Sequence, residues 1–153
     1  MTPAKQLYTD IGGEPVGDCL RTCVAMILDL EPQHVPHFVQ EYLRYPDAQM
    51  RTWPGFEDQL VTVPRWAAAC QGWLRNRGFQ MATFGGPPEG YTGWAIATGP
   101  SPRGDFSHAV VVYTVSKDDG GYEWRNAADP HPSNDYLAGE PTEFAVIERS
   151  SNA

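Results

Sequence analysis

The first half of the chain carries apolar residues at helical spacing. After Asp18, a good N-cap residue, five apolar side chains recur every three or four positions and predict a buried, central helix that ends before Pro32. The same period predicts a shorter helix over 35–43, a loop over 46–54 and a third helix over 64–78. The apolar positions of the first helix are Leu20, Cys23, Val24, Ile27 and Leu28.

The pattern changes after Gly78 to short apolar runs that are separated by glycine- and proline-containing turns. Such runs predict strands. Helices followed by strands predict an α+β fold with mostly antiparallel pairing, and 153 residues fit one domain over 1–153. The expected strands are 79–84, 94–98, 108–115, 122–128 and 144–148.

Composition narrows the classes of partner. The formal net charge is −8 and no cluster of Lys and Arg occurs, which argues against a nucleic-acid or anionic-membrane surface. No signal-peptide core or run of 18 apolar residues is present, so neither secretion by that route nor a membrane span is expected. Three cysteines outside any disulfide framework fit a reducing, cytoplasmic compartment.

Cys19 stands where a glycine-acid turn leads into the first predicted helix. A thiol in the first helical turn lies near unpaired backbone N–H groups and the positive end of the helix dipole, and both favour the nucleophilic thiolate. Cys23, one turn later on the apolar side, and Cys70 are expected in the core. Cys19 becomes a catalytic candidate if a histidine and a carboxylate converge on it.

A predicted hairpin supplies such a pair. Residues 117–121 (Lys-Asp-Asp-Gly-Gly) form a strong turn sequence between two expected strands. A hairpin centred between Asp118 and Asp119 pairs His108 with Asp129, with β-carbons about 5 Å apart on one face. A one-residue bulge shifts this register but leaves the two residues neighbours.

The three residue types form a coherent catalytic set. Cysteine supplies the nucleophile, and histidine takes its proton and later protonates the leaving group. A carboxylate orients the imidazole and fixes its tautomer. We therefore assign these roles to Cys19, His108 and Asp129.

The order Cys, His, Asp, with the cysteine opening the central helix and the other two on adjacent strands, resembles that of papain-like cysteine peptidases. Several short blocks are similar to C39-like peptidases, in particular to compact versions from bacteria and their phages. The resemblance covers residues 17–133. The blocks are Gly17-Asp18-Cys19, 28–30, 35–38, 101–104, 108–111 and 129–133.

The resemblance implies a papain-like fold in which the cysteine-bearing helix packs on the C-terminal sheet. It implies hydrolysis of a peptide, isopeptide or small amide through a thioester on Cys19, with no metal or cofactor. A phage-encoded member would act in the host cytoplasm. Transfer to another acceptor and deamidation use the same three residues and remain open, and so does the oligomeric state.

One position departs from the family pattern. Papain-like enzymes carry a glutamine about six residues before the cysteine, and its amide helps to bind the oxyanion. Gly13 occupies that place, and Gln6 is the only upstream glutamine. We take Gln6 as the oxyanion candidate, brought round by a longer arm, together with the backbone N–H of Cys19.

Four further residues are candidates for substrate binding. Arg103 lies in a Gly/Pro loop five residues before His108, where it alternatively stabilises the loop or is solvated. His131 competes with His108 as the base or lies on the surface. Trp53 and Trp94 are the tryptophans nearest to loops and are expected to line a groove.

Two alternatives belong to other classes. Cys19, Cys23, His34 and His37 loosely imitate a Cys2His2 zinc pattern, but both cysteines fall in one apolar helix. A papain-like scaffold can also bind a small molecule or a host protein without turnover, for instance as an inhibitor of a bacterial defence system. The glycine at position 13 favours this binding protein.

Overall fold

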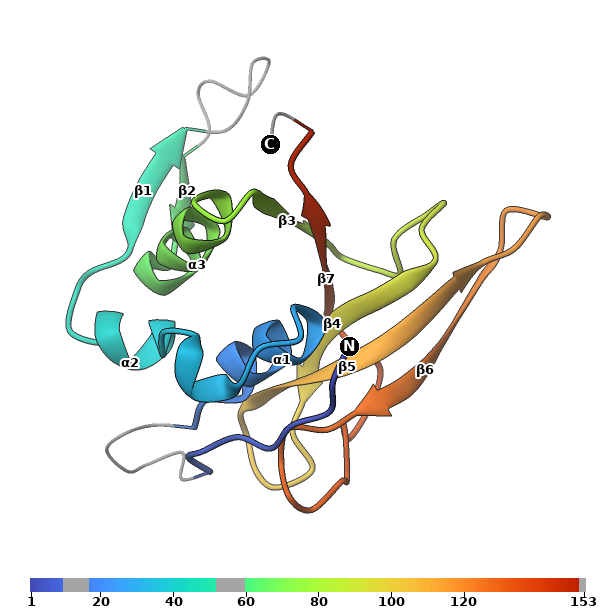
Figure 1. Cartoon of the computed structure of the whole chain (residues 1–153), viewed down its shortest axis with the longest axis horizontal. Coiled ribbons are helices and arrows are strands. Elements are labelled where there is room, and N and C mark those ends of the chain that lie inside the picture. The colour runs from blue at the N-terminus through green and yellow to red at the C-terminus, as the bar shows by residue number, and fades with distance from the viewer. Residues whose placement is uncertain (10–16, 52–59, 152–153) are drawn as a thin grey trace.

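The structure is a computed structural model that describes residues 1–9, 17–51 and 60–151. Within these ranges the chain forms three α-helices, one 3-10 helix (η1) and seven strands (Figure 1). In chain order they are α1 (Cys19–Ile27), η1 (Pro32–His34), α2 (Phe38–Tyr42), β1 (Ala48–Arg51), β2 (Leu60–Val63), α3 (Arg65–Arg75), β3 (Phe79–Phe84), β4 (Gly93–Pro100), β5 (Ser107–Ser116), β6 (Tyr122–Ala128) and β7 (Glu143–Arg149).

The five C-terminal strands form one sheet in the order β3-β7-β4-β5-β6, and every neighbouring pair is antiparallel. The predicted α+β class is therefore confirmed, and each of these strands lies within two residues of its expected bounds. β1 and β2 form a separate antiparallel pair. The prediction of a loop over 46–54 is wrong for 48–51, because Ala-Gln-Met-Arg lacks the β-branched alternation that signals a strand.

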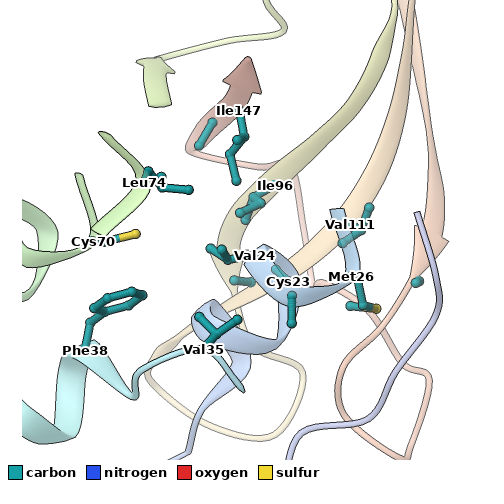
Figure 2. Close-up of a cluster of buried hydrophobic side chains, with 14 residues drawn as sticks. Cys23, Val24, Met26, Val35, Phe38, Cys70, Leu74, Ile96, Val111 and Ile147 are labelled. Carbon is teal, nitrogen blue, oxygen red and sulfur yellow. The ribbon is translucent and has the colours of Figure 1, made fainter. Parts of the chain in front are cut away.

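α1 is the central helix of the molecule. It lies between the sheet and the part of the chain that carries α2 and α3 (Figure 1). Its buried residues contact both sides: Val24 and Met26 belong to one apolar cluster with Ile96 and Val111 of the sheet and with Leu74 of α3 (Figure 2). Cys23 and Cys70 are fully buried in this cluster, which confirms their expected place in the core.

Successive side chains of β5 point to opposite faces of the sheet. In β5, Ala109 and Val111 face α1, while Val110 and Val112 belong to a second apolar cluster with Phe144 on the opposite face. Since β5 is buried on both faces over residues 108–112, packing holds the end of the strand at which His108 lies.

Two helix ends differ from the sequence prediction. Asp18 occupies the N-cap position of α1, but its side chain makes no capping hydrogen bond because other partners hold the carboxylate. The second helix begins at Phe38 rather than near Pro36, with His37 as its N-cap residue. In the described part of the chain, no helix has the length and apolar character that crossing a membrane requires.

Candidate active site

The β5–β6 hairpin brings His108 and Asp129 together by a route that differs in detail from the prediction. The turn is centred on Asp119, which shifts the pairing by one residue, and a bulge at Ala127 shifts it again between Val112 and Val111. The β5–β6 pairing ends at Val111 and Ala128, so Asp129 follows the last residue of β6, while His108 pairs with Gly99 of β4 on the other side of β5. The predicted backbone register is wrong, but the predicted proximity is confirmed, since His108 Nε2 lies 2.7 Å from Asp129 Oδ1.

The Asp129 carboxylate accepts hydrogen bonds from three donors. Its Oδ1 accepts from the His131 backbone N–H at 2.9 Å as well as from His108, and its Oδ2 accepts from the Tyr136 backbone N–H at 2.8 Å. Burial raises the pKa of Asp129, but these donors outweigh it and the net pKa is lowered. The carboxylate is therefore anionic near neutral pH, and it organises the loop that follows it.

His108 is buried and its protonation state follows from its contacts. Burial lowers the pKa of His108, and the neighbouring Asp129 carboxylate only partly opposes this effect. A neutral imidazole that donates Nε2–H to Asp129 carries no proton on Nδ1. The Asp129 contact thus leaves Nδ1 as the basic nitrogen, the form that a general base requires.

Cys19 is the first residue of α1 and is half-buried. Its thiol lies beside the start of β5, where the backbone N–H of Ala109, the residue after His108, is near enough to lower the pKa of the thiol. Burial raises the pKa of the Cys19 thiol above its ordinary value, against the lowering effect of the Ala109 and Leu20 N–H groups. The expected preference for thiolate is therefore wrong, because desolvation exceeds what these donors supply.

The N-terminal arm carries Gln6 to the site. The backbone N–H of Gln6 donates to Pro130 O at 2.8 Å, beside Asp129. The Gln6 Nε2 group donates to Tyr8 O, which also accepts the Asp18 backbone N–H at 3.2 Å. Gln6 therefore lies next to the start of α1, as an oxyanion residue must, although Tyr8 takes one of its two amide hydrogens. Gly13 lies outside the described residues.

Asp18 fastens this arm. Its carboxylate accepts from the backbone N–H groups of Tyr8 at 2.9 Å and Leu7 at 3.3 Å, and from Arg21 Nε at 2.7 Å. Asp18 and Arg21 are both buried, so the ion pair is shielded from solvent. The residue before Cys19 thus binds the N-terminal arm rather than capping the helix.

We expect Asp18→Asn to destabilise the protein by about 2–3 kcal/mol, because it leaves buried Arg21 without a carboxylate and turns an amide N–H₂ toward backbone donors. Urea unfolding followed by circular dichroism measures the change. The matched control is Asp118→Asn on the exposed hairpin turn, which should leave the unfolding midpoint unchanged. Equal midpoints for the two variants would contradict the anchoring role.

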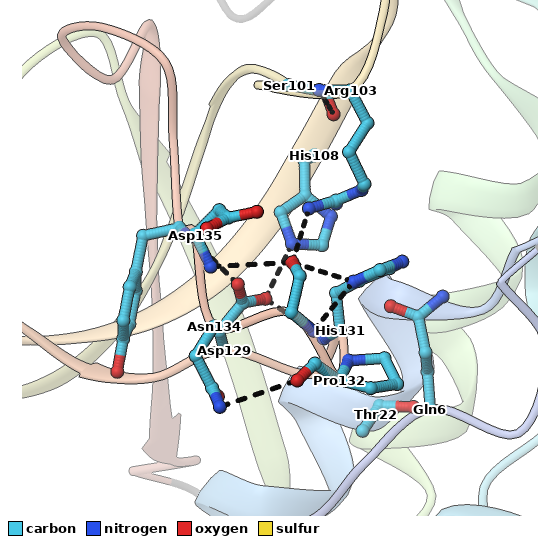
Figure 3. Close-up of polar contacts among 12 residues, drawn as sticks. Gln6, Thr22, Ser101, Arg103, His108, Asp129, His131, Pro132, Asn134 and Asp135 are labelled. Carbon is cyan, nitrogen blue, oxygen red and sulfur yellow. Dashed lines mark hydrogen bonds and ion pairs between the residues drawn. The ribbon is translucent and has the colours of Figure 1, made fainter.

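Arg103 and His131 both lie at the site. Arg103 Nη1 donates to Ser133 Oγ at 3.1 Å, and the Ser133 backbone N–H donates to His131 Nδ1 at 3.0 Å. Figure 3 shows the Arg103 side chain running beside His108, and its charge contributes to the lowered pKa of His108. The rings of His131 and His108 meet edge to face at 6.3 Å.

The two tryptophan candidates have different outcomes. Trp94 stands at the opposite end of the β4–β5 pair from Gly99 and His108, roughly 16 Å along the strand, and packs edge to face on Tyr113 at 4.7 Å. Its predicted place in a groove at the site is wrong, because strand pairing turns it into a packing residue. Trp53 lies outside the described residues.

Three contacts at the site were not predicted from the sequence. Lys5 Nζ donates to Asp129 O at 2.8 Å and to His131 O at 3.2 Å, a contact across more than 120 residues that no local motif reveals. His37 lines a cavity of about 30 Å³ beside Cys19, enough for about two water molecules. Ser133 belongs to the 129–133 block, but no sequence feature indicated that it links Arg103 and His131.

The four residues of the zinc pattern all fall within the described ranges. Across those ranges no three His, Cys, Asp or Glu side chains gather as a metal-binding group, and these four are no exception.

No protein-family model, no curated protein and no solved structure matches the chain. The site is thus defined by its own geometry, a buried Asp–His pair beside a cysteine that opens a helix.

Proposed function

We propose that the protein is a papain-like cysteine hydrolase that acts on a peptide, isopeptide or small amide bond through a thioester on Cys19. The observation that carries the proposal is the 2.7 Å contact between His108 Nε2 and Asp129 Oδ1, both buried. Ala109, the residue after His108, lies beside Cys19, where its backbone N–H lowers the pKa of the thiol. A carboxylate in this place orients the imidazole and fixes the tautomer in which the other ring nitrogen is free to act as a general base.

The pKa directions indicate how the first step proceeds. The raised pKa of Cys19 and the lowered pKa of His108 both favour a neutral thiol and a neutral imidazole at rest. His108 Nδ1 therefore takes the thiol proton while Sγ attacks the carbonyl carbon, and Asp129 stabilises the imidazolium that forms. The imidazolium then protonates the departing amine as the C–N bond breaks, which leaves the thioester.

The second half of the cycle regenerates the enzyme. His108 takes a proton from water as the water oxygen attacks the thioester, and the C–S bond breaks to release a carboxylic acid. The imidazolium returns its proton to Sγ. The backbone N–H of Cys19, in the first turn of α1 where amides lack helical partners, is the donor that we assign to the oxyanion.

The proposal is tested by acylation with 4-nitrophenyl acetate. We expect a burst of nitrophenolate and an acetyl group on Cys19 in peptide mapping, with both absent in Cys19→Ala. The rate should rise with pH through a pKa below the ordinary histidine value of 6.5, because only neutral His108 accepts the thiol proton. In His108→Ala the rate should rise only as the thiol itself ionises, above pH 9.

An acid limb that persists in His108→Ala would show that another group is the base. Acetylation spread over lysines, with Cys19 unmodified until the protein unfolds, would overturn the hydrolase proposal. That outcome favours the second candidate, a papain-like binding protein without turnover, for which the half-buried thiol and its raised pKa are the supporting observations.

A further inference from the structure

The amide oxygen of Gln6 is the polar atom of the site that the protein leaves unsatisfied. Gln6 is about nine-tenths buried, and no donor among the described residues reaches its Oε1. A buried acceptor without a partner carries a desolvation cost that a donor from a ligand can remove.

The orientation of this amide follows from its other contact. Tyr8 O is an acceptor, so the Gln6 nitrogen must face it, and the oxygen must face the opposite way. In Figure 3 the oxygen points toward His131 and the loop after Asp129, and the nitrogen points away from them. The carbonyl of Tyr8 thus fixes which end of the amide is presented to the site.

The position of the amide follows from the backbone around it. Tyr8 O also binds the N–H of Asp18, the residue before Cys19, and the Gln6 N–H binds Pro130 O, the residue after Asp129. The arm therefore holds Gln6 between the two elements that carry the proposed nucleophile and the proposed orienting carboxylate.

We infer that Gln6 Oε1 accepts a hydrogen bond from a substrate N–H that lies within a few bonds of the carbon attacked by Cys19. The inference rests on the proposed function and narrows its substrate class. Peptides supply this donor from the backbone nitrogen of the acyl residue, whereas acyl groups without that nitrogen, or with a proline or N-methylated residue there, do not. Gln6 is then a residue for substrate specificity, and the Cys19 backbone N–H remains the oxyanion donor.

The test compares alkylation of Cys19 by iodoacetamide and by N,N-dimethyliodoacetamide. The nitrogen of either adduct lies three bonds from Sγ, as does the backbone nitrogen of the acyl residue in a peptide thioester, but only iodoacetamide carries N–H. The measured quantity is the alkylation rate with iodoacetamide divided by the rate with N,N-dimethyliodoacetamide. We expect this ratio to fall by about 3- to 10-fold from wild type to Gln6→Met, because methionine has a side chain of similar length but no acceptor oxygen. Comparing ratios cancels the added bulk of the methyl groups.

Two variants accompany this measurement. Gln6→Glu, protonated when buried, keeps a carbonyl toward the site and a hydroxyl toward Tyr8 O, so it should retain the wild-type ratio. Gln71 lies on α3, and its Nε2 group donates to Met81 O at 3.1 Å. Gln71→Met removes this similar hydrogen bond away from the site and should leave the ratio unchanged. A wild-type ratio in Gln6→Met would overturn the inference, and so would its loss in Gln6→Glu.

Failure of the proposed function has a separate signature. If wild-type Cys19 reacts with iodoacetamide no faster than His108→Ala does, the enzyme itself is refuted, whatever the ratio of the probes. If Cys19 is reactive in a His108-dependent manner and the ratio is the same in wild type and Gln6→Met, the hydrolase stands and the role of Gln6 is refuted.

Discussion

His108→Ala is expected to slow acylation of Cys19 by 4-nitrophenyl acetate by about 10²- to 10⁴-fold at pH 7, the usual contribution of a general base. The physical reason is the raised pKa of the Cys19 thiol, which leaves little thiolate in the absence of a base. Single-turnover release of nitrophenolate measures the effect, with peptide mapping to confirm that Cys19 is the acylated residue.

The controls for this experiment are two other histidines. His34→Ala, at an exposed position of η1, should retain the wild-type rate. His131→Ala removes the ring that meets His108 edge to face, but its Nδ1 already accepts from the Ser133 N–H, so we expect a loss of less than about tenfold. A large loss in His131→Ala together with a small loss in His108→Ala would reverse the assignment of the base.

The proximity of His108 and Asp129 was predictable because strong turn chemistry and two apolar strands define the hairpin locally. The turn residues did not reveal that Asp119 would be its centre, nor that Ala127 would bulge. These two shifts change which backbone residues pair. The side chains of His108 and Asp129 still meet, because the bulge and the end of β6 both lie within two residues of Asp129. The pairing of residue types was thus more predictable than the register.

The surroundings of the three residues were predictable only in part. A helix start at Cys19 suggested a stabilised thiolate, but the electrostatic balance depends on burial by β5 and the arm, which local sequence does not contain. Asp18 appeared to be a helix cap because Asp is common there, and its true partners lie ten and eleven residues earlier. Lys5 reaches the Asp129 loop across the whole chain.

The position of Gln6 shows what the missing glutamine at residue 13 changes. Gln6 lies thirteen residues before Cys19 and still reaches the start of α1, because the arm is hydrogen-bonded at two places. The Tyr8 N–H donates to the Asp18 carboxylate, and the Gln6 N–H donates to Pro130 O. The same two contacts place the Gln6 Nε2 group beside Tyr8 O, to which it donates. The spacing therefore governs which atom of the amide faces the site, a property that the presence of the residue alone does not reveal.

Asp129→Ala is expected to lower both stability and reactivity. It leaves the His108 Nε2–H and the backbone N–H groups of His131 and Tyr136 without their acceptor. Since part of the following loop can turn to solvent, we expect a loss of about 2–4 kcal/mol in the free energy of unfolding, measured in urea. Acylation of Cys19 should fall by at least 10²-fold, because the imidazole loses both its fixed tautomer and its counter-charge.

Asp129→Asn separates the carboxylate's charge from its geometry. Its Oδ1 can still accept from His108 and His131, so the tautomer should be retained, although the amide N–H₂ now faces the Tyr136 N–H and lowers stability. Acylation should therefore fall less than in Asp129→Ala. Because the Asp129 carboxylate raises the pKa of His108, its removal should move the acid limb of the rate profile to lower pH. A shift to higher pH, or an Asn variant as inactive as the Ala variant, would contradict the role assigned to the charge.

The pH dependence of unfolding gives an independent measure of the same carboxylate. The folded state lowers the pKa of Asp129 below its ordinary value of 3.8, so its stabilising contribution is fully present above that pH and is lost as the pH falls through the lowered pKa. Wild type should therefore lose more stability than Asp129→Asn between pH 5 and pH 2. Parallel losses in the two proteins would mean that the carboxylate is no better stabilised in the fold than in the unfolded chain.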